Sequence, residues 1–442
     1  MKTVIMAGGK GTRIQSVTSD IPKPMIKIDG VPVLEREIES LRSQGFLDII
    51  ITISHLGSII KDYFKDGKKW GVNIQYFFEK EPLGNAGALF KIRNQLDSDF
   101  LLLNADAVFD VDFNRMVKFH QSKNALITLF THPNSHPYDS GLLIADKNCK
   151  VKQWLTKEDD RPCYYKNRVN AGLHVINPHV LDMINIDSEM IGKKINGKVF
   201  KVDLDRQILK PLTITGKIFC YDSPEYVKDM GTPERLKSVQ KDFSEGKVHA
   251  RNLENKQKAI FLDRDGVINR YVGFLRNLEE FELIEGVSEA IKNINQSGYL
   301  CIVITNQPVI ARGEVTYEQL DEIHNKMETL LGLDGAYIDG LYYCPHHPHK
   351  GFKGEITELK IDCDCRKPKP GLLLKAAEEF NIDLGKSWMV GDSESDIKAG
   401  INARCKTALV NGNESIGVNR DVGQNITVKS LREFVDKIIL NK

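Results

Sequence analysis

The chain has 442 residues, of which 41% are hydrophobic and 27% charged, and its formal net charge is +1. This length predicts about two or three domains of ~150 residues, and the balanced charge gives no electrostatic case for nucleic acid or an anionic membrane as partner. No charged-then-apolar leader precedes the first strand, no apolar run approaches the ~18 residues of a membrane span, and most of the eight cysteines are scattered singly, so we expect a cytoplasmic protein.

Short apolar runs that alternate with amphipathic stretches predict an α/β chain with a largely parallel sheet covered by helices. In the N-terminal part, the expected strands are Thr3–Met6, Ile49–Ile53, Ile74–Phe78, Phe100–Leu103 and Ala125–Phe130, with helices that include Val33–Gln44 and Asn85–Gln95. The pattern weakens after Arg235, and residues 241–257 are expected to be a terminal helix followed by a linker. The alternation resumes with strands at Ala259, Leu300–Thr305, Gly340–Tyr343, Trp388–Gly391 and Lys406–Val410.

A glycine-rich segment follows the first expected strand directly. Gly8, Gly9 and Gly11 allow backbone N–H groups to approach a phosphate closely, and Thr12-Arg13 adds a permanent cation. Lys23 lies between two prolines ten residues later, on a stiffened backbone that can hold an ammonium group against a phosphate. The spacing matches neither a P-loop nor a dinucleotide fingerprint. The alternative to a phosphate site is a simple tight turn.

The pair of motifs G-G-x-G-T-R and P-K-P resembles the sugar-phosphate nucleotidylyltransferases, including the guanylyltransferases that act on mannose 1-phosphate or heptose 1-phosphate. The resemblance covers about residues 1–240. It implies that the segment Glu81–Gly87, with Gly84, faces the nucleotide base and that Asn104 and Asp106 end a strand at the site. It further implies catalytic roles for Arg13 and Lys23, sugar or sugar-phosphate contacts for Lys157, Asn170 and Gly172, and Mg²⁺ binding by Asp106 and Asp229.

This chemistry needs no nucleophilic side chain. The sugar-phosphate oxygen attacks the α-phosphate of a nucleoside triphosphate, and catalysis consists mostly of positioning and of placing cations near the phosphates. The family often has Glu-Lys where this chain has Thr156-Lys157, so the sugar hydroxyls that are recognised are in question and a sugar other than a hexose is an alternative.

A second candidate catalytic motif is Asp263-Arg264-Asp265-Gly266, again at the end of an apolar strand. One carboxylate can attack phosphorus while its neighbour donates a proton to the leaving oxygen, and such a pair also attracts a divalent cation. The order Asp263-x-Asp265, Thr305-Asn306, Arg366-Lys367 and Gly391-Asp392 resembles the haloacid dehalogenase superfamily phosphatases. The resemblance implies a nucleophile (Asp263), an acid/base (Asp265), phosphate holders (Thr305, Asn306, Lys367) and Mg²⁺ ligands (Asp263, Asp265, Asp392). A phosphate-binding relic without turnover is the alternative.

Three cysteines and a group of histidines lie close together in the sequence. Cys344, Cys363 and Cys365 with one imidazole make a closed tetrahedral donor set suited to structural Zn²⁺. His346 is the expected fourth ligand, and His347 and His349 compete for that role. Because Arg366 and Lys367 follow directly, we expect the zinc to fix the loop that carries these cations. Unrelated surface cysteines are the alternative.

This cluster, together with the aspartate motif, resembles two related phosphatase families over about residues 257–435: the heptose 1,7-bisphosphate 7-phosphatases and the histidinol phosphatases. The stretch Ile310–Gly313 and the run Cys365–Gly371 are closer to the heptose enzymes. Pro308-Val309 stands where those enzymes often have Ser-Gly, which leaves the loop geometry and the anomer open. The extra cations Arg312 and Arg366 would suit a second phosphate, with ordinary solvated charge as the alternative.

The two resemblances together predict two Rossmann-like domains. A nucleotidylyltransferase domain with a mixed sheet occupies residues 1–240, and a haloacid dehalogenase-like domain with a parallel sheet, a zinc loop and no large cap occupies residues 258–442. Their reactions would be consecutive in the supply of activated heptose, because the phosphatase product is a sugar 1-phosphate. GTP is favoured by resemblance alone. The alternative is a mannose 1-phosphate transferase joined to a histidinol-phosphatase-like or non-catalytic zinc domain. Whether the chain forms homo-oligomers stays open.

Overall fold

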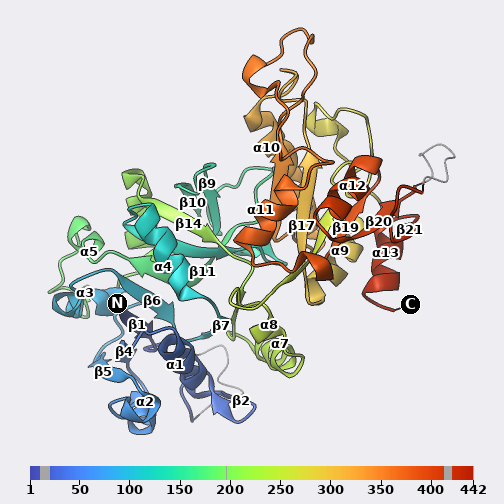
Figure 1. The fold of residues 1–442 in the computed structure, drawn as a ribbon. Coiled ribbons are helices and arrows are strands. Elements are labelled where there is room, and N and C mark those ends of the chain that lie inside the picture. Colours follow the sequence, from blue (N-terminus) through green and yellow to red (C-terminus); the bar gives the residue numbers. More distant parts are fainter. Residues whose placement is uncertain (10–19, 196, 413–420, 442) are drawn as a thin grey trace. The chain divides into compact units, whose positions relative to one another are not determined.

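A computed structural model describes residues 1–9, 20–195, 197–412 and 421–441. These residues form two compact units (Figure 1). The first contains residues 1–131, 143–155 and 170–252, and the second contains 132–142, 156–169 and 253–442. The predicted site residues Gly11, Thr12 and Arg13 lie outside the described residues.

The first unit is built on a mixed sheet, as predicted. Its main path runs β10-β9-β11-β6-β1-β4-β5, and β8 pairs with β11 and β14. Strand β1 is parallel to β4 and β6, whereas β11 is antiparallel to β6. The strands are β1 Lys2–Met6, β4 Asp48–Ile53, β5 Asn73–Phe78, β6 Phe100–Asn104, β8 Ile127–His132, β9 Leu142–Ala145, β10 Val151–Leu155, β11 Val169–Ile176 and β14 Ile218–Asp222.

The central strands of this sheet are apolar on both faces because each face carries its own core. Val4 of β1 belongs to one buried cluster, and Ile5 belongs to the other. Leu102 and Leu103 of β6 divide in the same way. This alternation follows from the period of two along a strand, and it explains why the sequence shows near-continuous apolar runs there.

Helices cover this sheet, and the predicted helix at Val33–Gln44 is confirmed as α1 Val33–Ser43. The predicted helix Asn85–Gln95 is shorter than expected: α3 spans Gly87–Lys91, and a separate 3-10 turn follows at Arg93–Gln95. The remaining helices of the unit are α2 Gly57–Phe64, α4 Phe113–Ser122, α5 Val180–Met183, α6 Lys210–Leu212, α7 Pro233–Ser244 and α8 Lys247–Ala250.

Three small antiparallel ladders supplement the main sheet. Strand β15 (Tyr226–Asp229) pairs with β7 (Ala107–Asp110) so that Asp229 stands opposite Ala107, and the Met230 N–H donates to the Asp106 carbonyl at 3.0 Å. This ladder therefore brings the chain at Asp229 beside the chain at Asp106. The other two pairs are β2 Lys27–Ile28 with β3 Val31–Pro32, and β12 Lys194–Ile195 with β13 Lys198–Val199.

The second unit contains a six-stranded sheet in the order β18-β17-β16-β19-β20-β21. Every pairing in it is parallel, which confirms the prediction. In a parallel sheet the carboxyl ends of all strands meet at one edge, where open α/β folds bind ligands. The strands are β16 Lys258–Leu262, β17 Tyr299–Asn306, β18 Gly340–Cys344, β19 Trp388–Gly391, β20 Lys406–Val410 and β21 Ile426–Val428.

Helices lie on both faces of this parallel sheet. Buried side chains of α9 (Val287–Gln296), α10 (Tyr317–Leu333) and α13 (Leu431–Ile438) join one core with Ile260 and Leu262 of β16. Those of α11 (Gly371–Glu379) and α12 (Glu394–Asn402) join the other core with Ala259 and Phe261. Strand β16 is thus enclosed on both sides, and its end at Leu262 delivers Asp263 to the shared edge.

Two segments from the N-terminal half of the sequence, residues 132–142 and 156–169, belong to the second unit. The backbone N–H of Tyr165 donates to the hydroxyl of Thr329 on α10 at 2.8 Å, and the N–H of Asn167 donates to the Glu328 carboxylate at 2.8 Å. This hydrogen bond compensates for the burial of the Glu328 carboxylate on α10, because buried carboxylates need donors.

The segment expected to be a helix and linker is more ordered than predicted. Helix α7 begins earlier, at Pro233 after the cap Thr232, and α8 follows at Lys247–Ala250. The side chain of Asn252 then donates to Asp110 at 2.6 Å in the first unit. The carbonyl of Leu253 accepts from Asn381 at 2.9 Å in the second. No helix among the described residues is long and apolar enough to cross a membrane.

Candidate active sites

The first unit contains a cavity of about 630 Å³ at the carboxyl ends of β1 and β6. Six residues predicted for the nucleotide site line it: Gly8, Gly9, Lys23, Gly84, Asn104 and Asp106. The structure therefore brings the glycine turn, the P-K-P lysine, the predicted base loop and the end of β6 to one place.

Two of these glycines are required by close approach. An added Cβ at Gly8 would lie 2.6 Å from Oε1 of Glu79, and one at Gly84 would lie 2.2 Å from the Val202 carbonyl oxygen. Gly84 also has φ of +86°, in the left-handed region that favours glycine. Among the described residues, no heavy atom lies within 4 Å of a Cβ added at Gly9, so they give no steric reason for that glycine.

Several charged side chains lie beside the β7/β15 ladder. Lys23, which is 8% exposed, pairs with Asp106 at 2.8 Å. Asp229 accepts two bonds from Arg235 on α7, at 2.7 and 2.9 Å, and one from the Gly231 N–H at 2.8 Å. Burial opposes ionisation of Asp229, but these donors outweigh it and hold the pKa of Asp229 below its usual range. The carboxylates of Asp106 and Asp229 are therefore near one lysine, a donor set that fits a hard divalent cation.

The predicted sugar-contacting residues are only partly brought to this cavity. Gly172 lies against Asn104, since an added Cβ would be 2.5 Å from Nδ2 of Asn104. The side chain of Asn170 accepts the Gly172 N–H at 3.3 Å and lies 3.1 Å from Nε2 of the buried His174. Asn170 is not among the described residues that line the cavity. Lys157 is exposed and belongs to the second unit.

Two cavity residues, Glu79 and Lys201, were not predicted from the sequence. Glu79 is 6% exposed and accepts the N–H of Leu83 at 3.4 Å. Burial raises the pKa of its carboxyl, partly offset by Leu83 and Thr52. A carboxylate just before the base-loop motif was the available signal for Glu79, whereas nothing in the local sequence marked Lys201.

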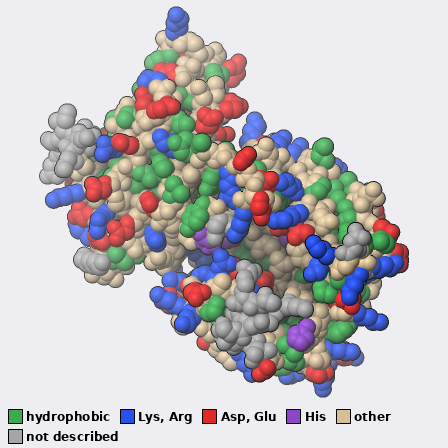
Figure 2. Space-filling model, turned by 180° about the vertical axis from the view of Figure 1, so that it is seen from behind, with side chains coloured by type: hydrophobic (Ala, Val, Ile, Leu, Met, Phe, Trp, Pro, Cys, Tyr) green, Lys and Arg blue, Asp and Glu red, His purple; other side chains and the backbone are tan. Residues whose placement is uncertain are grey.

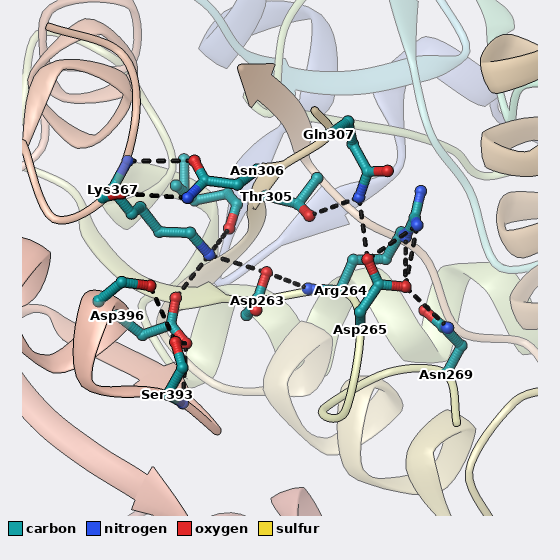
Figure 3. A network of polar contacts seen from close by, with 12 residues as sticks. Asp263, Arg264, Asp265, Asn269, Thr305, Asn306, Gln307, Lys367, Ser393 and Asp396 are labelled. Atoms are coloured by element: carbon teal, nitrogen blue, oxygen red, sulfur yellow. Dashed lines mark hydrogen bonds and ion pairs between the residues drawn. The ribbon is translucent and has the colours of Figure 1, made fainter. Parts of the chain in front are cut away.

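In the second unit, Lys367 joins two carboxylates at the edge of the parallel sheet (Figure 3). Its Nζ lies 2.8 Å from Asp263 and 2.6 Å from Asp396, and it donates to the Ile304 carbonyl at 2.8 Å. Burial opposes the charge of Lys367, but the two aspartates outweigh it and raise its pKa. Asp396 lies one helical turn beyond Asp392, and its spacing could have identified it from the sequence.

Asp263, Asp392 and Asp396 form a carboxylate group in which one oxygen from each lies within 4.8 Å of the others. Burial, and then Asp396, raises the pKa of Asp263, while burial followed by Asp263 raises that of Asp392 to about 8. Because Lys367 is one cation beside three carboxylates, the group is short of positive charge at neutral pH. The donor set therefore fits Mg²⁺. Gly266, with φ of +83°, allows this packing, since an added Cβ would lie 2.1 Å from Asp392.

The side chain of Asp265 lies outside that group. It accepts from Arg264 at 2.8–3.2 Å, from Asn269 at 3.0 Å and from Gln307 at 2.9 Å (Figure 3). Burial opposes its ionisation, but Arg264 outweighs burial and holds the pKa of Asp265 below its usual range. Arg264 is fully buried and also donates to the imidazole of His324 at 3.2 Å. Burial strongly lowers the pKa of His324, so this imidazole is neutral.

The predicted phosphate-holding residues lie at the end of β17. The hydroxyl of Thr305 accepts from Gln307 at 2.9 Å. Asn306 exchanges two hydrogen bonds of 3.1 Å with the backbone of Lys367. Asn306 therefore fixes the loop that presents the lysine, and Gln307 links Thr305 to Asp265.

The predicted sulfur and imidazole donors are together. One ligand atom from each of Cys344, His346, Cys363 and Cys365 lies within 4.8 Å of the others. The sulfur of Cys365 is 3.1 Å from that of Cys363 and 3.2 Å from Nδ1 of His346. His347 instead places its Nδ1 3.3 Å from the His349 carbonyl. The geometry therefore selects His346, and three thiols with one imidazole fit a tetrahedral zinc site.

Replacing one of these thiols should release a bound metal and loosen the loop. We expect Cys365→Ser to lose about one zinc per chain and to melt several degrees lower, since about 1 kcal/mol corresponds to roughly 2–4 °C in a domain of this size. Elemental mass spectrometry and calorimetry measure the two effects. The matched control is Cys163→Ser, because Cys163 is exposed and outside the group. Equal zinc content in both variants would contradict the assignment.

The two extra cations differ in their surroundings. Arg312 is not a solvated charge: its guanidinium carbon lies 4.0 Å from the ring centroid of Phe274 and 4.2 Å from that of Phe352. Only 14% of its side chain is exposed. Arg366 donates to the carbonyl of the donor residue His346 at 3.2 Å. This bond ties the cation loop to the sulfur–imidazole group.

Comparison with known proteins agrees with these two sites. Residues 2–245 match the family model described as nucleotidyl transferase, and residues 217–404 match the haloacid dehalogenase-like hydrolases. The D-glycero-beta-D-manno-heptose-1,7-bisphosphate 7-phosphatase of Pasteurella multocida (strain Pm70) is 42% identical over 179 residues, which are 40% of this chain and 95% of that protein. The chain belongs to both the nucleotidyl transferase and the heptose-bisphosphate phosphatase families. It is a bifunctional enzyme, as predicted.

Other relatives match the same parts of the chain. The phosphatase of the same name from Escherichia coli (strain K12) is 41% identical over 152 residues, 34% of this chain and 78% of that protein. A crystal structure of HddC from Yersinia pseudotuberculosis is 26% identical, covers 55% of this chain and 99% of that one, and has a TM-score of 0.45. A TM-score this low adds no argument to the family assignment.

Proposed function

We propose that the two halves catalyse consecutive steps in the synthesis of nucleotide-activated D-glycero-D-manno-heptose. The C-terminal half would remove the 7-phosphate of the heptose 1,7-bisphosphate, and the N-terminal half would transfer a nucleoside monophosphate, probed first as GMP from GTP, to heptose 1-phosphate. The observation that carries the proposal is that a chain segment covering 95% of a heptose-bisphosphate phosphatase continues directly from a nucleotidyl transferase. The product of the one family is the kind of substrate used by the other.

In the phosphatase reaction, Asp263 is the proposed nucleophile. Its carboxylate oxygen forms a bond to phosphorus while the bond from phosphorus to the sugar oxygen breaks. Asp265, which must leave its pair with Arg264 and take up a proton first, donates that proton to the sugar oxygen. A water molecule then attacks the phosphorus of the aspartyl phosphate, Asp265 takes its proton, and the Asp263 carboxylate is regenerated. Lys367, already 2.8 Å from Asp263, and Thr305 hold the phosphate oxygens. Mg²⁺ bound by Asp263 and Asp392, with the Asp265 carbonyl, would neutralise the developing charge.

In the transferase reaction, the bond that forms joins the sugar-phosphate oxygen to the α-phosphorus, and the bond that breaks releases pyrophosphate. We infer that Lys23 leaves part of its contact with Asp106 to a phosphate oxygen and that Arg13 supplies a second cation. Asn104, Asn170, Gly172 and Lys157 would contact the sugar phosphate. Mg²⁺ bound by Asp106 and Asp229 would neutralise the triphosphate.

Guanine is the proposed base because of Glu79. Guanine presents two donors on one edge, N1–H and the N2 amino group, and a carboxylate with two acceptor oxygens complements both. Glu79 lies in the cavity beside the base loop, where it accepts from the Leu83 N–H at 3.4 Å and from Thr52. These two bonds leave acceptor capacity on its two oxygens. A cytosine or adenine base offers no such pair of adjacent donors.

The second phosphate of the bisphosphate would be bound by cations next to the phosphatase site. We assign this role to Arg366, and to Arg312 through its stacked guanidinium, because both belong to loops near the sulfur–imidazole group. For this half we also propose a structural zinc ion in that group and no large cap over the site. The eight free cysteines support a reducing, cytoplasmic location. Basic and acidic side chains both occur across the face in Figure 2, in keeping with small-molecule substrates rather than nucleic acid.

The test offers the protein each anomer of heptose 1,7-bisphosphate with Mg²⁺ and one nucleoside triphosphate at a time. We expect release of one inorganic phosphate per sugar, followed with GTP by pyrophosphate and a product of the mass of GDP-heptose, as detected by mass spectrometry. Faster phosphate release from histidinol phosphate would overturn the choice of phosphatase substrate. Transfer to mannose 1-phosphate in preference to heptose 1-phosphate would overturn the choice of sugar.

A further inference from the structure

Lys201 enters the cavity of the first unit from a short extended segment that is fixed on both sides. The N–H of Phe200 donates to the Lys193 carbonyl at 2.9 Å, and the N–H of Val202 donates to the Leu83 carbonyl at 2.9 Å. The carbonyl of Val202 in turn accepts the N–H of Ala86 at 3.2 Å. The backbone around Lys201 is therefore paired with the base loop itself.

The alternation of side chains along this segment directs Lys201 toward the cavity. Val202 is fully buried in the core that also contains Leu83, and Phe200 packs against the same core. Because successive side chains of an extended segment point to opposite sides, Lys201 points away from the core, and it lines the cavity together with Gly84 and Asn85. Among the residues that the structure describes, no carboxylate forms an ion pair with it.

The cavity thus has two charged side chains of opposite sign beside the base loop, Glu79 and Lys201. Guanine has two edges of matching character: N1–H and N2–H₂ are donors, while O6 and N7 are acceptors. An ammonium or guanidinium group on O6 and N7 is the most frequent specific contact that proteins make with this base. Adenine carries an amino donor in place of O6, which an ammonium group cannot satisfy.

We propose that Lys201 is a specificity-determining residue that donates to the O6/N7 edge of guanine. The inference rests on the proposed guanylyl transfer and adds to it a second group that selects the base. In this arrangement Glu79 selects the donor edge and Lys201 the acceptor edge.

The experiment compares Lys201→Met with the wild-type protein on GTP, ITP and ATP. We expect kcat/KM to fall about 5- to 150-fold for GTP, the range that corresponds to 1–3 kcal/mol per good base contact at 1.4 kcal/mol per tenfold, and by a similar factor for ITP, which keeps O6 and N7. It should stay level or rise for ATP, and Lys201→Arg should keep most of the GTP preference. The matched control is Lys198→Met on β13, outside the cavity lining, and thermal melting and circular dichroism of both variants verify that the first unit is folded.

The outcomes separate this inference from the function on which it rests. An equal loss for GTP and ATP would show a phosphate contact and overturn the assignment of Lys201. An unchanged GTP preference in Lys201→Met would overturn it as well. A wild-type protein that prefers a triphosphate other than GTP would instead refute the proposed base, and with it the role given to Lys201.

Discussion

Asp263→Asn should abolish phosphate release and leave nucleotidyl transfer intact. An amide cannot form the aspartyl phosphate, and the change also removes the partner of Lys367 at 2.8 Å, so we expect kcat to fall by about 10⁴-fold or more, as for other removed nucleophiles. Inorganic phosphate measured from heptose 1,7-bisphosphate gives the loss. Pyrophosphate measured from GTP and heptose 1-phosphate gives the retained activity.

The control for this variant is Asp436→Asn on α13, which alters a carboxylate of the same unit outside the catalytic group. It should retain both activities. Phosphate release by Asp263→Asn within tenfold of the wild-type rate would exclude Asp263 as nucleophile. Absence of phosphate release from the wild-type protein as well would instead favour the view that the second unit binds phosphate without turning it over.

The second large effect is expected at the other site, where Asp106→Asn should lower nucleotidyl transfer by roughly 10³-fold while phosphate release is unchanged. The variant removes a predicted metal ligand and the partner that holds Lys23 at 2.8 Å, and charge placement is the main source of catalysis in such transfers. Pyrophosphate release measured against Mg²⁺ concentration should show a higher Mg²⁺ requirement as well as a lower maximal rate.

Asp97→Asn serves as the control, because this carboxylate is 78% exposed and makes only a 3.6 Å pair with Lys2. It should leave the rate and the Mg²⁺ requirement unchanged. If Asp106→Asn behaved like Asp97→Asn, the metal site would have to be sought elsewhere in the cavity.

The motif order in the sequence predicted the two sites because several of the motifs directly follow a strand. Once β16, β17 and β19 pair in parallel, their carboxyl ends must meet, and Asp263, Thr305 and Asp392 follow from that rule. Asp396 was missed as a site residue although it is one turn from Asp392, since a lone acidic residue on a helix is ordinarily solvent-facing.

Other residues could not be predicted because their positions depend on contacts between distant segments. Lys201 reaches the cavity only because Val202 pairs with the base loop, more than a hundred residues earlier. Arg264 looked like a spacer between two aspartates, yet it is fully buried against Asp265 and His324. His346 was the expected fourth donor of the sulfur group, with His347 and His349 as competitors, and the fold places His346 beside Cys365.

The chain continues from the first unit into the second between Asn252 and Leu253. This covalent linkage affects metabolic flux. Both sites are translated as one polypeptide, so a cell that makes this chain holds them in a fixed one-to-one ratio. The standing concentration of the shared sugar 1-phosphate then depends on the two turnover rates and on competing enzymes, and changes in expression raise or lower both steps together. Within this chain, selection on that concentration therefore acts through the catalytic constants of the two halves and not through their relative expression.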